Sequence, residues 1–346
     1  MFDKLIKLAN KIKPLGIIFI ILLLIIVSFF VGYFIGVKRD HQKVVDQYLN
    51  SISPVRESDL PYKFIKPLLT YNIPSSQDEK EFSAIKDEIN DLIDKKKKAD
   101  KLTGFSLFIS ELDKGRWIGV NEAEKYSAAS LWKVTLMMAY YKKAQTDNNI
   151  LSQKLIYSKT MNDLTVQSKF DTPSELEIDK TYTIDDLINK MIIDSDNGAK
   201  TLLLANIEDS YMNTIYADLT VPNPETTNYV VSPLNYSLFF RVLYNSSYLY
   251  KTMSEKALEL LSKTTFNDGL VAGLPAGITV SHKYGERVIN SNDQIDSVEL
   301  HDCGIVYYKP SPYFICIMTE GTNIDDLKNT IKEVSGLLYN KISNKI

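Results

Sequence analysis

The chain has 346 residues, of which 45% are hydrophobic and 24% are charged, an ordinary balance for a protein that buries a core. Its net charge is −3 and its pI about 5.8, and Lys95 to Lys98 form its one basic run. Nucleic-acid binding needs clustered cations, so we interpret this run as a solvated helix end and expect no nucleic-acid partner.

Residues 15–37 contain no Asp, Glu, Lys or Arg. A helix of this length would cross a hydrocarbon core of roughly 30 Å. A cleaved signal peptide is the alternative, but no small-residue cleavage site follows the apolar run. Lysines slightly favour the N-terminal side, so we expect a cytoplasmic segment 1–14 and a single-pass signal anchor in the cell membrane, with the rest of the chain extracytoplasmic.

Residues 38–79 read as an extracytoplasmic stalk, because they are polar and carry four prolines, which block long helices. The apolar stretch 64–69 within this stalk could dock on a folded domain.

The pattern changes at residue 80 and predicts a domain over 80–346. Apolar spacings of three and four predict a helix near its start and another at its end, with the final stripe starting at Ile324. Strands are expected at 104–110, 116–120, 278–284, 303–308 and 313–319, the first two joined by a hairpin turn. A helical stretch lies between the two groups of strands. The fold class is therefore α+β, with three α/β/α layers: a sheet covered by the terminal helices and an inserted helical lobe at about 126–265.

Cys303 and Cys316, the only cysteines, fall on neighbouring strands of an expected hairpin. Pairing the strands around Lys309 to Pro312 places the two side chains on one face but diagonally, an awkward distance for a disulfide. We therefore expect buried free thiols.

Ser130 and Lys133 form an SxxK pair at the expected start of a helix. One turn apart on the same face, the lysine can approach the serine hydroxyl, which needs a base to become a nucleophile. The pair occurs by chance in many helices, so by itself it is weak.

Two further motifs follow in order. Ser195-Asp196-Asn197 offers a second hydroxyl for proton transfer and an amide for substrate, although the tripeptide is also common at helix caps. His282-Lys283-Tyr284-Gly285 ends an expected strand, where the lysine supplies positive charge and the glycine permits close backbone approach.

With these three motifs, the chain from about residue 80 onward resembles the class A β-lactamases and related penicillin-recognising serine hydrolases. The resemblance implies the β-lactamase/D,D-peptidase fold, with a five-stranded antiparallel sheet. Its implied catalytic residues are Ser130 as acylated nucleophile, Lys133 as base or proton relay, and Ser195 in proton transfer. Asn197, Lys283, Tyr284 and Gly285 would bind substrate, and the backbone N–H groups of Ser130 and Glu286 would form an oxyanion hole.

The chain departs from the family at two positions. Tyr284 stands where the family carries a smaller hydroxyl residue that contacts the substrate carboxylate, which leaves substrate choice open. The family's ExxLN motif, whose glutamate activates the deacylating water, is incomplete: Leu234-Asn235 matches its tail, but Val231 takes the glutamate position. Asp218 and Glu225 lie nearby without the pattern.

Three functions remain open: hydrolysis of β-lactams, D,D-peptidase-like hydrolysis of cell-wall peptides, and non-hydrolytic binding of either ligand by a membrane-tethered module. No GxSxG elbow, phosphate loop or HExxH zinc helix occurs, so we expect no metal ligands and no cofactor. His282 reads as a structural or pocket-wall residue. With one anchor and one domain, a monomer is expected.

Overall fold

The computed structural model describes residues 53–56, 61–72, 80–113, 115–165, 174–222, 230–291, 294–309 and 311–343, with five helical positions between 23 and 32. The described residues from 53 onward belong to one compact unit. The predicted anchor at 15–37 lies outside the described residues, apart from those five positions. Within the described part, no helix is both long and apolar enough to span a membrane.

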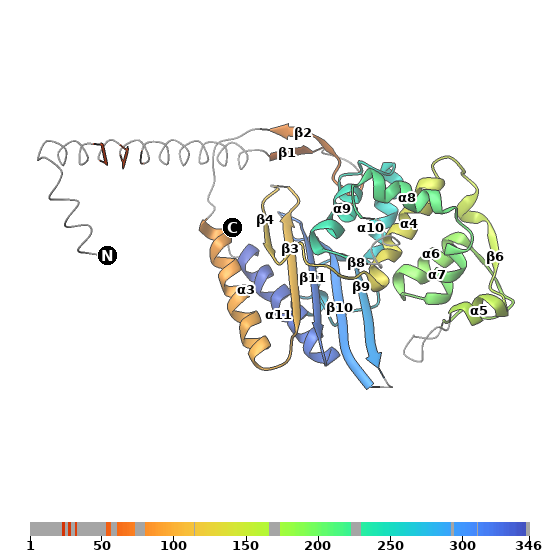
Figure 1. Cartoon of the computed structure of the whole chain (residues 1–346). Helices are drawn as coiled ribbons and strands as arrows, with labels where there is room; N and C mark the ends of the chain where they lie inside the picture. The colour runs from red at the N-terminus through yellow and green to blue at the C-terminus, as the bar shows by residue number, and fades with distance from the viewer. Residues whose placement is uncertain are drawn as a thin grey trace, which may run out of the picture. The chain divides into compact units, whose positions relative to one another are not determined.

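A five-stranded antiparallel sheet forms the centre of the larger unit (Figure 1). Its order is β4 (Trp117–Val120), β3 (Gly104–Glu111), β11 (Tyr313–Gly321), β10 (Gln294–Val306) and β9 (Val280–Ser291). The first and last portions of the domain are therefore joined in one sheet by the pairing of β3 with β11, and β9 lies at its edge.

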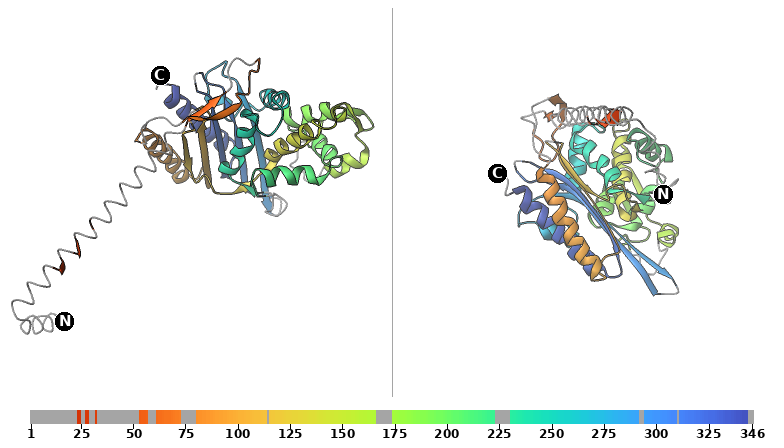
Figure 2. Two further views of the ribbon diagram at one scale, coloured as in Figure 1. Left: turned by 90° about the horizontal axis from the view of Figure 1, so that it is seen from above. Right: turned by 60° about the vertical axis from the view of Figure 1, so that its left-hand side comes forward.

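Two terminal helices cover one face of the sheet, α3 (Lys80–Lys98) and α11 (Ile324–Ser343), and they lie together against it in Figure 2. Alternate strand residues point to this face, as the two-residue period of a strand requires, and Leu107 and Ile317 there are fully buried. Ile331 of α11 is likewise fully buried in the same core. The apolar stripes that predicted the two helices are thus the surfaces that fix them to the sheet.

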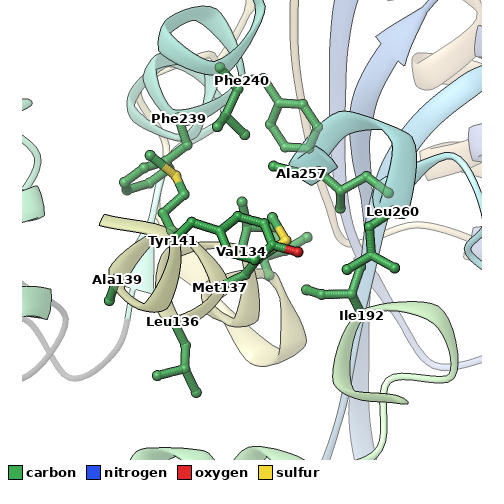
Figure 3. Packing of buried hydrophobic residues seen from close by; sticks show 14 of the residues in the cluster. Val134, Leu136, Met137, Ala139, Tyr141, Ile192, Phe239, Phe240, Ala257 and Leu260 are labelled. Atoms are coloured by element: carbon green, nitrogen blue, oxygen red, sulfur yellow. The ribbon is translucent and has the colours of Figure 1, made fainter. Parts of the chain in front are cut away.

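A helical lobe covers the other face. Its central helix α4 is hydrophobic around most of its circumference, and side chains of α6, α9 and α10 surround it (Figure 3). The helices are α4 (Lys133–Lys143), α5 (Lys159–Thr165), α6 (Ile184–Ile193), α7 (Asn197–Leu204), α8 (Asp209–Asp218), α9 (Pro233–Tyr244) and α10 (Lys251–Leu261). Short elements complete the unit: η1 (Ala129–Trp132), η2 (Ile150–Ser152), η4 (Val271–Gly273), and the strand pairs β1 (Ser53–Arg56) with β2 (Leu68–Asn72), β5 (Tyr126–Ser127) with β8 (Val230–Val231), and β6 (Lys154–Ile156) with β7 (Thr181–Thr183).

The α+β class, the five-stranded antiparallel sheet and the helical lobe agree with the sequence prediction. Strands β9 and β10 are longer than the expected 278–284 and 303–308, and they continue into polar sequence. Glu286 and Arg287 are exposed on β9, so apolar content falls while backbone pairing to β10 persists. Apolar runs therefore marked only the covered parts of these strands.

The prediction of free thiols is wrong, because Cys303 and Cys316 form a disulfide. In the β10–β11 hairpin the two residues are directly opposite, and their Cα atoms are 3.9 Å apart. The register is set by Val306 pairing with Tyr313, which removes the diagonal offset that the sequence prediction assumed. The disulfide cross-links the central strand β11 to its neighbour β10 within the buried core.

Replacing both cysteines, Cys303→Ala with Cys316→Ala, should lower the free energy of unfolding by about 2–4 kcal/mol, since it removes a short-loop cross-link. Urea unfolding of the oxidised protein and the double variant measures this difference. Alkylation of both cysteines in urea without reductant, detected by intact mass, would contradict the disulfide.

Candidate active site

Ser130 lies in the short helix η1, which leads directly into α4. Pairing of β5 with β8 fixes the chain just before it. Ala129 has φ +43°, a left-handed conformation that is unfavourable for a residue with a side chain. Such strain persists only where the surrounding structure enforces it, and it is concentrated at functional sites. The N–H of Ser130 belongs to the first turn, where no intrahelical carbonyl is available to it.

Lys133, one turn after Ser130, is 1% exposed and points into the interface with the second motif. Its Nζ donates to the backbone oxygen and the hydroxyl of Ser195, the latter at 3.1 Å, and to Asn197 Oδ1 at 2.8 Å. The SxxK lysine and the SDN motif are therefore joined directly.

The three residues of the Ser195-Asp196-Asn197 turn make different contacts. Ser195 has φ +58°, again left-handed, and Asn197 begins α7. Asp196 is buried and caps α7 by accepting from the N–H of Ala199 at 2.7 Å, while it also accepts from Ser174 Oγ. The helix-cap interpretation of this tripeptide thus holds for Asp196, while its neighbours face Lys133.

The third motif reaches the same point from β9. Lys283 is fully buried, and its Nζ donates to Ser195 Oγ at 2.9 Å and to the Tyr284 carbonyl at 3.1 Å. Burial lowers the pKa of Lys283 to about 7, partly opposed by the nearby Asp302 carboxylate. The Tyr284 ring lies 4.2 Å from this nitrogen and stacks on Phe266 at 4.3 Å between centroids.

Gly285 and Glu286 bring the edge of β9 against the nucleophile turn. A Cβ built on Gly285 would lie 3.2 Å from both the Ser130 nitrogen and the Ala128 oxygen, so only glycine fits without displacement. The carbonyls of His282 and Tyr284 accept hydrogen bonds from side chains and therefore point away from β10. Alternation along an antiparallel strand then turns the Glu286 N–H to the same free edge.

The structure thus brings together Lys133, Ser195, Asn197 and Lys283 by hydrogen bonds, beside Ser130 and Gly285. Sequence reasoning missed the two left-handed positions, Ala129 and Ser195, because neither residue type signals positive φ. It also missed Phe266, which lies 18 residues before Tyr284 and touches it only through the fold.

The position that the sequence assigned to the family glutamate lies in β8. Val231 is buried, pairs with Tyr126, and lines a small cavity with Ala128 and Trp132 behind the nucleophile turn. Leu234 and the following Asn235 lie in the first turn of α9, which Ser232 caps. Of the nearby acids, Asp218 ends α8 and accepts from Tyr248 at 2.9 Å, while Glu225 lies outside the described residues.

Two histidines lie within the described part, and both are buried in the sheet. His282 Nδ1 is 2.8 Å from Asp302 Oδ1, a pairing that fits the structural role expected for it. Burial lowers the pKa of His301 to about 4, so that ring is neutral at pH 7. His41 lies outside the described residues. Among those described, no three His, Cys, Asp or Glu side chains gather as a metal site.

Lys283→Met should stabilise the fold between pH 6 and 7 by about 1–3 kcal/mol, since burying a charge without a carboxylate partner is costly. A lysine in the unfolded chain has a pKa of about 10.4, so between pH 7 and 10 the unfolded wild type binds more protons and native stability rises with pH. The advantage of the variant should therefore shrink over that range.

Urea unfolding at several pH values, with the exposed Lys263→Met as control, measures this advantage. An advantage of Lys283→Met that does not change between pH 7 and 10 would contradict the low pKa.

The chain matches the sequence model of the β-lactamase enzyme family over residues 84–342. No curated protein matches it in sequence. Its fold is similar to PBP-A, solved as a mutant in an acyl-enzyme complex with penicillin-G, with TM-score 0.62 and 19% identity over 76% of this chain and 97% of that one.

Two β-lactamase structures are also similar in fold. TLA-1 extended spectrum β-lactamase gives a TM-score of 0.64 at 18% identity, over 76% of this chain and 99% of that one. A β-lactamase from Chitinophaga pinensis gives 0.63 at 18% identity, over 75% and 99%. These identities show a shared fold only, whereas the family match spans most of the chain. The protein belongs to the β-lactamase enzyme family.

Proposed function

We propose that the protein is a serine hydrolase that attacks a β-lactam or a related amide through an acyl-enzyme on Ser130. The observation that carries this proposal is the convergence of two buried lysines, Lys133 and Lys283, on the hydroxyl of Ser195, next to the turn that holds Ser130. A structural role alone would not require two lysine side chains to donate to one buried hydroxyl, because each ammonium is costly to desolvate.

Lys133 acts as the base in this scheme. Both lysine nitrogens bind one oxygen, so they are at most about 6 Å apart, a separation at which each disfavours the other's charge. A neutral Lys133 takes the proton of Ser130 as Oγ bonds to the carbonyl carbon. The resulting oxyanion would accept from the N–H groups of Ser130 and Glu286; the close approach of Gly285 to the Ser130 nitrogen supports this assignment.

Ser195 completes the transfer. When both lysines are protonated, its oxygen accepts two hydrogen bonds and so uses both lone pairs. The remaining O–H must then donate elsewhere, and a leaving nitrogen in the site would receive that proton as the C–N bond breaks. Lys133 returns the proton taken from Ser130 to Ser195, which closes the cycle without a metal or cofactor group in the proton path.

The substrate side of the site is formed by Asn197, Lys283, Tyr284 and Gly285. Lys283 already donates to two oxygens and faces the Tyr284 ring. Lys283 would therefore act on the substrate through its positive charge and through its hydrogen bond to Ser195. Tyr284 and Phe266 are half-buried and form an aromatic pair beside this lysine. An uncharged or apolar substrate group next to the scissile amide would pack against that pair.

A D,D-peptidase-like activity on cell-wall peptides is the second candidate, and Val231 favours it over rapid β-lactam turnover. A buried valine beside the nucleophile turn cannot activate water, so a β-lactam acyl group would persist on Ser130. Non-hydrolytic binding of either ligand would result if no group at all activated water to release the product.

We place this domain outside the cytoplasmic membrane, held by the predicted anchor at 15–37. The Cys303–Cys316 disulfide supports this placement, since disulfides persist in oxidising compartments and are rare in the cytosol.

Intact-mass analysis of the protein mixed with penicillin tests the proposal, and we expect an adduct of one penicillin that is lost slowly. Ser130→Ala should form none, because the attacking oxygen is removed. An equal adduct on Ser130→Ala, or no adduct on the wild type over hours, would contradict the acylation. Steady hydrolysis of a chromogenic cephalosporin separates the β-lactamase from the peptidase candidate, which predicts a single burst.

Ser195→Ala should slow acylation of Ser130 by roughly 10²- to 10⁴-fold, the usual contribution of a positioned proton donor. The rate of adduct formation under single-turnover conditions measures this effect. Ser335→Ala, which removes a buried hydroxyl on the opposite face of the sheet, is the matched control and should leave the rate unchanged. Equal rates for Ser195→Ala and wild type would exclude Ser195 from proton transfer.

A further inference from the structure

Residues 61–67, here called the clasp, precede the family-matched part of the chain at 84–342 yet are packed into its core. Phe64 and Ile65 are only 5% and 6% exposed and join the hydrophobic cluster of the helical lobe. Their neighbours Lys63 and Lys66 are exposed. The clasp therefore has its apolar pair inserted into the domain and its charged side chains directed outward.

Glu255, in the middle of α10, binds the backbone of the clasp. Its carboxylate accepts from three successive N–H groups, those of Lys63 at 2.6 Å, Phe64 at 2.9 Å and Ile65 at 2.9 Å. Hydrogen bonds to a charged acceptor are stronger than neutral ones. A single carboxylate that collects three consecutive amides recognises main chain, independent of side-chain identity.

Further contacts hold the clasp from its other sides. The Lys66 N–H donates to the Tyr244 carbonyl at 2.9 Å, and Tyr307 Oη donates to the Phe64 carbonyl at 3.1 Å. The Tyr307 and Phe64 rings meet edge to face at 5.4 Å, and Lys66 pairs with Asp113 at 2.9 Å. The hydrogen-bond partners of the clasp thus come from α10, the end of α9, the end of β10 and the β3–β4 turn, so the clasp is held by several elements at once.

We propose that these contacts form a docking site for the chain's own clasp, and that docking holds the domain near the membrane. This inference rests on the predicted anchor at 15–37 and not on the chemistry at Ser130. With residues 53–72 docked, 15 residues connect Val37 to the domain, a reach of at most about 50 Å. Without docking, the 42 residues from 38 to 79 would reach about 150 Å.

The occupant is the same chain and not a second copy, because residues 53–72 belong to the same compact unit as 78–346. The clasp also shares α10 with the candidate site. Ser281 donates to the Leu258 carbonyl of α10 at 2.6 Å, two residues before Lys283. Docking thus limits the distance of the domain from the membrane. It also holds α10, the helix that contacts the edge strand β9.

Glu255→Gln in the full chain, reconstituted in lipid nanodiscs, tests the docking. The neutral amide accepts fewer and weaker bonds, so hydrogen exchange of the amides at 63–65 should accelerate at least tenfold. Glu259→Gln, one turn along α10 in an exposed pair with Lys263, is the control and should leave exchange unchanged. Equal exchange in both variants would overturn the proposal.

Energy transfer from a dye on Lys97→Cys to dye-labelled lipid headgroups tests the membrane reach. If docking shortens the chain between the anchor and the domain, the efficiency of energy transfer should fall in the Glu255→Gln variant. Faster exchange with unchanged transfer would overturn the spacing role. Clasp exchange that slows as protein concentration rises would instead assign the occupant to a second copy. Penicillin labelling of Ser130 is measured in parallel, so that a failed acylation is distinguished from a failed clasp.

Discussion

The hydroxyl of Ser195 accepts hydrogen bonds from Lys133 and from Lys283, and the rest of the site depends on that shared contact. The three residues come from the helix after the nucleophile, from a turn of the helical lobe and from the edge of the sheet. None is near another in the chain except through the fold. The lobe and the sheet must therefore be held in one fixed arrangement for the contact to exist.

The two hydrophobic cores provide that arrangement. Helices α3 and α11 hold one face of the sheet, and the lobe holds the other, with the buried Cys303–Cys316 disulfide in the central strands. The stability of these cores supports local features that are unfavourable by themselves. The left-handed conformations at Ala129 and Ser195 cost of order 1–3 kcal/mol each, and a fully buried Lys283 adds to that cost. Strain and buried charge gathered at one site are typical of catalytic centres.

Sequence reasoning predicted the architecture well because the signals were periodic: apolar stripes gave the two terminal helices, and short apolar runs gave the strands. It missed what depends on register or on backbone geometry. The disulfide required the exact pairing of Val306 with Tyr313, and the polar ends of β9 and β10 carried no apolar signal. The motifs at Ser130, Ser195 and Lys283 could be found in sequence, but their meeting at one hydroxyl required the structure, as did the aromatic pair of Tyr284 and Phe266.

Attack on a carbonyl and release of the product are separate steps of the proposed reaction: Lys133, Ser195 and Lys283 gather beside the turn of Ser130 for the first, whereas Val231 supplies no base for the second. A crystal structure of the protein treated with penicillin is the most direct test of the first part. We predict continuous density from Ser130 Oγ to the acyl carbon, with the acyl oxygen within hydrogen-bond distance of the backbone nitrogens of Ser130 and Glu286. Density joining penicillin to another residue, or an acyl oxygen directed away from those two nitrogens, would contradict it.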